Sequence, residues 1–160
     1  MSSDIQNEHI AWHHVRREVL YAMLLICVLS FAAFRWVWWP VRISGDSMTP
    51  TYDDGQPNYI NRLAYLSAPP RRGDVVGLRV GHEVYIKRII GLPGEKIEFR
   101  RDIIVVNGRP LAEPYPVKPL LWRLNPVQLG ANDYFVMGDN RPISMLGAIG
   151  RDRIIGKAVF

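Results

Sequence analysis

Two residues in this sequence have the chemistry of a nucleophile and a base, Ser47 and Lys87. Ser47 lies in the stretch Ile43–Asp54, ISGDSMTPTYDD, whose Gly, Asp, Ser, Thr and Pro residues are typical of a surface turn. A serine hydroxyl is a weak nucleophile until a neighbouring base accepts its proton. Whether this stretch is a plain turn or part of an active site therefore depends on which base can reach Ser47.

Lysine is a better candidate for that base than histidine. A Ser/His/Asp triad needs a histidine near the serine. Beyond the apolar run that precedes Ser47, the chain has only His82, in the turn-like sequence VGHE. Lysine is the other base that activates a serine in proteins. The chain contains four lysines, which are Lys87, Lys96, Lys118 and Lys157.

Lys87 is distinguished by its neighbours, because VYIKRII reads as a strand with apolar residues on both sides of the lysine. Alternate residues of a strand share a face, so Lys87 lies on the face of Tyr85 and Ile89. If that face is buried, desolvation lowers the lysine pKa from about 10.4, and a fall of about 3 units gives a general base at pH 7. The strand pattern leaves open an alternative, an edge-strand lysine with its ammonium in water.

The apolar run that precedes Ser47 predicts a membrane-spanning helix at 19–39. It reads VLYAMLLICVLSFAAFRWVWW, and its uninterrupted apolar part covers about sixteen residues, or roughly 24 Å of helix. Arg35 can extend its head group to the interface, the tryptophans form an aromatic belt, and Pro40 ends the helix. A cleavable secretory signal fits less well, because bulky tryptophans flank the run and no small-residue cleavage site follows.

This span divides the chain into an N-terminal tail at 1–18 and a domain at 40–160. Two arginines precede the span and two lie at or after its end, so the positive-inside comparison is nearly even. We favour the arrangement with the N-terminus inside and the domain outside.

The composition restricts the partners and cofactors. The net charge of +5 would suit a nucleic-acid-binding protein. The basic residues are scattered, however, and no nucleic-acid-binding motif is present, so no nucleic acid partner is expected and anionic lipid explains the charge equally well.

The single cysteine, Cys27, cannot form a disulfide within the chain. No Cys or acidic residue completes a convincing metal site with the N-terminal histidines at 9, 13 and 14, and no nucleotide motif occurs, so neither a metal nor another cofactor is expected.

The domain after Pro40 is predicted to be compact and mainly β. Its apolar stretches are short, rich in Val, Ile, Tyr and Phe, and bounded by turn residues, as strands are. The turn signals are Leu92–Glu95 and Val106–Arg109, and proline-containing loops are expected at Ala68–Arg72 and Glu113–Pro126. The predicted strand regions are Asp74–Val80, Glu83–Leu92, Lys96–Gly108 and Asp133–Gly138.

Four blocks of this domain, in this order, resemble the motifs of type I signal peptidases, the S26-type Ser/Lys membrane peptidases. They are SGDSMTPT (Ser44–Thr51), RGDVV (Arg72–Val76), YIKRIIGLPGE (Tyr85–Glu95) and MGDNRPIS (Met137–Ser144). The closing Ile155–Ala158 is similar to the family's last strand. The resemblance implies a membrane-anchored serine endopeptidase with a mainly β domain of coiled sheets, which removes signal peptides from exported proteins.

The resemblance also implies roles for single residues. Ser47 would be the nucleophile, with its backbone N–H donating to the oxyanion, and Lys87 would be the general base. Ser144 would orient the lysine, Met48 would shape the substrate pocket, and Pro50-Thr51 would fix the turn that presents the serine.

The sequence departs from the family pattern at two places. Some members have a second serine two residues before the nucleophile, where this chain has Gly45. The family often continues after the position of Ser144 with an acidic-Ser-Arg element, where this chain reads MLGAIGR, without the carboxylate and shorter. We expect the missing support for the lysine to come from Asp139 or Arg141, or to be absent, and a minimal version of the fold without an inserted cap.

The implied substrates are secretory preproteins with Ala or Gly before the cut, because a shallow apolar pocket rejects larger side chains. The substrate would lie extended and pair as an added strand. The other implied partner is the lipid bilayer. The family places the N-terminus in the cytoplasm and the catalytic domain outside the cytoplasmic membrane, or uses the mitochondrial inner membrane if the source is a eukaryote.

Three alternatives share parts of this pattern. A specialised relative, such as the conjugation-system peptidase that matures pilin, would have the same motifs. A self-cleaving Ser/Lys protein of the repressor type would carry a DNA-binding domain where this chain has the apolar run. A non-catalytic membrane-anchored relative would keep the fold after losing activity, and the altered segment after Ser144 is the feature that suggests it.

Overall fold

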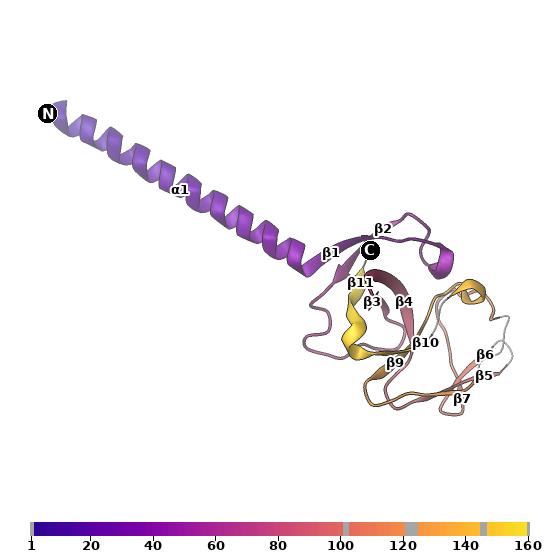
Figure 1. Ribbon diagram of the computed structural model, residues 1–160. Coiled ribbons are helices and arrows are strands. Elements are labelled where there is room, and N and C mark those ends of the chain that lie inside the picture. The colour runs from indigo at the N-terminus through magenta and orange to yellow at the C-terminus, as the bar shows by residue number, and fades with distance from the viewer. Residues whose placement is uncertain (1, 101–102, 121–124, 145–146, 160) are drawn as a thin grey trace. The chain divides into compact units, whose positions relative to one another are not determined.

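The computed structural model describes residues 2–100, 103–120, 125–144 and 147–159, with side chains from residue 16 onward. The chain divides after Val37 into two units, each compact by itself. The first consists of one helix, α1 (Ser2–Val37), and the second is a β domain that begins at Trp38 (Figure 1).

Helix α1 contains a candidate membrane span at Arg16–Val37, with a mean hydropathy of 2.0. The helix ends two residues before the predicted boundary, so the expected end at Trp39 is wrong. Trp38 and Trp39 instead begin strand β1 (Trp38–Arg42). Proline disfavours helical backbone angles at the residue before it, so Pro40 ends the helix earlier than its own position suggests.

The β domain contains two antiparallel sheets within the described residues, which confirms the predicted mainly β fold (Figure 1). The larger sheet curls and carries Lys87 on one of its interior strands. Its strands in spatial order are β1, β2 (Pro57–Asn61), β11 (Ile154–Val159), β3 (Val75–Val80), β4 (Glu83–Gly91), β9 (Asp133–Met137) and β10 (Gly147–Gly150). The smaller sheet has the order β7 (Arg109–Pro110), β6 (Ile103–Val106), β5 (Lys96–Arg100) and β8 (Val127–Gln128).

The predicted strand regions and hairpin are confirmed. Strands β3, β4 and β9 fall inside the predicted ranges, and the described part of 96–108 contains the β5–β6 pair. The Val106–Arg109 turn joins β6 to β7 with positive φ angles at Asn107 and Gly108, 50° and 80°, as a tight hairpin turn requires. The predicted loop at 113–126 has no strand in its described part, while 121–124 lie outside the described residues.

The strands that the sequence did not predict are short. They have few β-branched residues and lie mostly at sheet edges, so their local signal is weak. They are β1, β2, β7, β8 and β10. Three short 3-10 helices complete the described elements, η1 (Asp46–Met48), η2 (Arg141–Ile143) and η3 (Arg151–Arg153).

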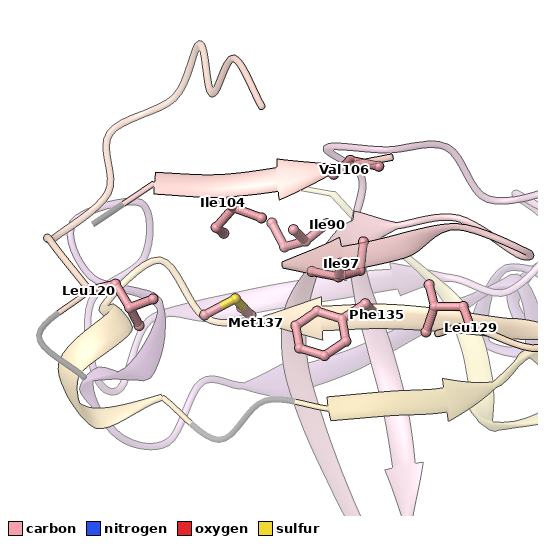
Figure 2. Packing of buried hydrophobic residues seen from close by; sticks show 8 residues of the cluster. All are labelled: Ile90, Ile97, Ile104, Val106, Leu120, Leu129, Phe135 and Met137. Carbon is pink, nitrogen blue, oxygen red and sulfur yellow. The ribbon is translucent and has the colours of Figure 1, made fainter. Parts of the chain in front are cut away.

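Apolar packing joins the two sheets into one domain. Figure 2 shows side chains from β4 and β9 of the larger sheet facing those of β5 and β6 of the smaller one. Burying such side chains stabilises the domain by about 25 cal/mol per Å² of apolar surface. The cluster consists of Ile90, Ile97, Ile104, Val106, Leu120, Leu129, Phe135 and Met137.

Candidate active site

The turn that carries Ser47 is fixed by its own hydrogen bonds. Ser47 is the middle residue of η1, and the Gly45 N–H ahead of it donates to Asp54 Oδ1 at 2.7 Å. The φ angle of Gly45 is 83°, in the left-handed region that residues with a Cβ rarely adopt. Glycine at this position therefore has a backbone role, which accounts for its presence where some members of the resembled family carry a serine.

Met48 anchors this turn to the core. Its side chain is buried in a second apolar cluster, and its carbonyl accepts hydrogen bonds from the Thr51 and Tyr52 N–H groups at 2.9 and 3.1 Å. The other buried members of the cluster are Ile43, Tyr52, Val75, Ile86 and Ala158. The predicted turn at Ser47 is therefore present, and the buried side chain of Met48 attaches it to the core.

Lys87 lies beside Ser47, 40 positions away in the sequence. Its Nζ donates a hydrogen bond to Ser47 Oγ at 2.6 Å and another to the Ile86 carbonyl at 3.2 Å. Strand β4 is an interior strand between β3 and β9, and Lys87 is only 5% exposed. The edge-strand alternative is therefore wrong, because the ammonium does not reach water freely. Of the four lysines, all of which are described, only Lys87 is buried.

Burial changes the proton affinity of Lys87. Desolvation lowers its pKa from 10.5 to about 8, and the negative charge of Asp139 opposes part of that fall. A hydrogen bond between an amine with this pKa and a serine hydroxyl is the arrangement that activates the hydroxyl. Lys87 and Ile89 on this strand face are buried, which is the condition on which the lowered lysine pKa depended.

We predict that peptidase activity increases with pH through the pKa of Lys87. A base must be neutral, and its neutral fraction rises about tenfold per pH unit below the pKa, then levels off above it. Cleavage rates (kcat/KM) measured from about pH 6 to about pH 10 should therefore bend near pH 8. A rate that is flat across this range, or that still rises steeply at its upper end, would contradict the assignment of Lys87 as the base.

The segment Gly138–Ser144 lies directly behind Ser47. The Asn140 N–H donates to the Ser47 carbonyl at 3.1 Å, and the Asn140 side chain donates to the Asp46 carbonyl at 2.9 Å. The Gly138 N–H donates to Ser144 Oγ at 2.5 Å. The two Asn140 contacts hold the main chain of the serine turn at Asp46 and Ser47 against the segment that follows β9. Ser144 is buried here, and its role in orienting the lysine stays a prediction.

Asp139 and Arg141, the expected replacements for the missing acidic element, have different partners. Asp139 is fully buried and accepts hydrogen bonds from Arg88 at 2.8 and 2.6 Å and from Thr51 Oγ1 at 2.5 Å. Arg141 is 2% exposed, donates to the Gly138 carbonyl at 3.1 Å, and forms a two-contact ion pair with Glu113. Asp139 thus affects Lys87 through its charge, and Arg141 supports the segment behind Ser47.

An open cavity of about 340 Å³ adjoins Ser47 and Lys87. Its walls come from the segment that leads into the serine turn and from the first half of β4. Met48 is among its lining residues, and the role of Met48 in shaping a substrate pocket stays a prediction. The cavity could hold an extended peptide whose carbonyl reaches Ser47. Its lining residues are Val41–Ser44, Ser47, Met48 and Glu83–Lys87.

Within the region after Ser144, Gly147–Gly150 forms an apolar wall. It is strand β10, which pairs with β9 and has no ionisable side chain. Together with Lys87 it lines a second cavity of about 180 Å³. Met145 and Leu146, which belong to the same departure from the family pattern, lie outside the described residues.

Sequence reasoning missed several residues that position the site. Arg88 and Asn140 lie inside the quoted motifs, so their place beside Lys87 and Asp139 could have marked them as site residues. No local sequence pattern identifies their hydrogen-bond partners. Asp54 and Glu113 lie in loops that gave no signal of their own. His82 is exposed in the turn between β3 and β4, as predicted.

Comparisons with known proteins place the chain in a family. The family model for signal peptidase, peptidase S26, matches residues 16–160. The chain is 33% identical over 171 residues to signal peptidase I T of Bacillus subtilis, covering 96% of this chain and 85% of that protein. It is 31% identical over 167 residues to signal peptidase IB of Staphylococcus aureus, covering 89% of this chain and 87% of that protein.

One solved structure is also similar. A crystal structure of a signal peptidase I from Enterococcus faecalis is 28% identical, covering 55% of this chain and 95% of that chain, with a TM-score of 0.44. From the family model and the curated relatives, the chain belongs to the S26 family of signal peptidases.

Proposed function

We propose that this protein is a membrane-anchored serine endopeptidase that removes N-terminal signal peptides from exported preproteins with a Ser47/Lys87 dyad. The observation that carries the proposal is the 2.6 Å hydrogen bond between Lys87 Nζ and Ser47 Oγ, formed by a buried lysine with a lowered pKa. Membership of the signal peptidase family supplies the class of reaction.

In the proposed reaction, neutral Lys87 takes the Ser47 proton while Oγ attacks the scissile carbonyl carbon. The Ser47 N–H donates to the resulting oxyanion. When the carbon–nitrogen bond breaks, the Lys87 ammonium gives its proton to the leaving amine, and the signal peptide stays esterified to Ser47. Lys87 then takes a proton from water, and the hydroxide attacks the ester carbonyl carbon. As the bond to Ser47 Oγ breaks, the Lys87 ammonium returns its proton to Oγ, and the signal peptide leaves with a free C-terminal carboxyl group.

The proposed substrate lies extended in the 340 Å³ cavity, against the segment 41–44 and the first half of β4. Apolar side chains such as Met48 and Ile86 leave room for Ala or Gly before the cut and exclude larger residues by steric clash. Pairing of the substrate main chain with a strand would fix its register.

The proposed location is the cytoplasmic membrane, or the mitochondrial inner membrane in a eukaryote. The tail 1–18 would lie in the cytoplasm, α1 would span the bilayer up to Val37, and the β domain would lie outside. The apolar part of α1, with its candidate span at Arg16–Val37, supports the membrane-spanning helix of this proposal. Preproteins would then be cleaved on the outer side of the membrane.

The test uses the purified full chain in detergent with a preprotein that carries an Ala-x-Ala cleavage site. We expect mass spectrometry to find a single new N-terminus directly after the second alanine. A matched preprotein with tryptophan in place of that alanine should stay uncut. Absence of cleavage of the first substrate, or equal cleavage of both, would overturn the proposed function.

A further inference from the structure

The loop at 111–118, which we name the strap, lies across the residues that support the Ser47 turn. Its side chains alternate, with every second residue half-buried and the residues between them exposed. The Leu111 N–H donates to the Ile104 carbonyl at 2.8 Å, and the Lys118 N–H donates to the Asp139 carbonyl at 2.9 Å. Both ends of the strap are thus fixed, and its later end is attached to the segment behind Ser47.

Glu113, one of the inward-facing strap residues, neutralises a buried arginine. Both of its carboxylate oxygens accept hydrogen bonds from Arg141, whose side chain is 3% exposed. A buried guanidinium without a carboxylate partner is strongly destabilising. The Arg141 side chain also donates to the Gly138 carbonyl, so loss of Glu113 would disturb the main chain that contacts Ser144 and Ser47.

Tyr115, two residues later, covers the second buried arginine. The Arg88 guanidinium lies 3.9 Å from the centroid of the Tyr115 ring, within the range of a cation–π interaction. Arg88 in turn donates to both oxygens of Asp139, which also accepts from Thr51 in the serine turn. Two routes therefore connect the strap to the Ser47 turn, each through a buried arginine, and a side-chain hydrogen bond between Tyr115 and Glu113 links them.

We propose that Glu113 and Tyr115 are positioning residues, which hold the segment Gly138–Ser144 and through it Ser47 in the geometry that cleavage requires. This inference rests on the proposed function for its effect on rate. Neither residue touches the 340 Å³ cavity, so their loss should lower kcat while KM changes little.

The test compares Glu113→Gln with Glu95→Gln as a matched control. Glu95 also accepts from an arginine, Arg72, and its side chain is 17% exposed against 14% for Glu113. We expect Glu113→Gln to lower kcat about 10- to 100-fold, with KM within about threefold, because small displacements in an active site have effects of this size. Glu95→Gln should stay within about twofold of the wild type.

Two further sets of variants separate positioning from general destabilisation. In a cycle with Arg141→Gln, the double variant should be no slower than the slower single variant, because residues acting as one unit are not additive. Tyr115→Leu should lower kcat about 5- to 20-fold, and Tyr115→Phe, which keeps the ring over Arg88 but loses the hydroxyl that contacts Glu113, should recover part of that loss. Losses that add in the double variant, or that Tyr115→Phe does not recover, would contradict the inference.

A readout independent of cleavage is amide hydrogen exchange in the full chain. Glu113→Gln should speed exchange at 138–144 about tenfold, while Glu95→Gln leaves this segment unchanged. Unchanged exchange there, or equally faster exchange throughout the domain, would overturn the positioning role whether or not the protein cleaves preproteins. A wild type that cuts no preprotein would instead overturn the proposed function, and the exchange comparison would still decide the role of the strap.

Discussion

Replacement of Lys87 by alanine is expected to lower kcat/KM for preprotein cleavage by about three orders of magnitude or more. Without the amine, Ser47 Oγ loses the hydrogen-bonded base that takes its proton. The rate should be measured at about pH 8, where roughly half of the wild-type amine is neutral.

Two controls make this loss interpretable. Lys87→Met keeps most of the buried volume, and it should be as inactive as Lys87→Ala if the amine and not the packing is what matters. Lys96→Ala removes an exposed lysine that pairs with Glu98, and it should retain wild-type activity. Persistent cleavage by both Lys87 variants at neutral pH would contradict the assignment of Lys87 as the base.

Gly138→Ala is expected to lower kcat by about two orders of magnitude or more, because it forces Ser47 to move. A Cβ at this position would lie 2.0 Å from the Ser47 carbonyl oxygen and 2.6 Å from Ser144 Oγ. Neither distance is compatible with the present structure, and the main-chain oxygen cannot rotate away as a flexible side chain can. Cleavage kinetics and thermal unfolding should be measured on the same samples.

Gly81→Ala is the control for this substitution. Gly81 has a positive φ of 62°, but a Cβ there would meet nothing within 4 Å. It should lose roughly 1 kcal/mol of stability through backbone strain and keep its activity when folded. If folded Gly138→Ala protein is as active as Gly81→Ala, the close packing of Gly138 on Ser47 has no functional role.

Features that depend on neighbouring residues along the chain could be predicted from the sequence. Lys87 was identified because a charged residue among β-branched ones is conspicuous within a single strand, and β3, β4 and β9 were predicted for the same reason. The ordered motifs added the pairing of Lys87 with Ser47, although 40 positions separate the two residues. The hairpin turn at Asn107-Gly108 could be predicted in the same way, because it depends only on these two adjacent residues.

The rest of the site depends on contacts that no local pattern records. Arg88 and Asp139 are 51 positions apart, and Glu113 and Arg141 are 28 apart, so their pairing follows only from the folded sheets. The helix end was misplaced because the effect of Pro40 on the preceding residue was not applied. Strand β10 was missed because its sequence, GAIG, has little β propensity of its own.

The most direct test of the central claim is cleavage of the Ala-x-Ala preprotein by Ser47→Ala beside the wild type, with the new N-terminus identified by mass spectrometry. Ser47→Ala removes the attacking oxygen while the Lys87 amine and the cavity remain. We predict that the wild type releases the mature protein and that Ser47→Ala lowers the rate by about three orders of magnitude or more. Cleavage at the same bond by Ser47→Ala at a rate close to that of the wild type would show that Ser47 is not the nucleophile.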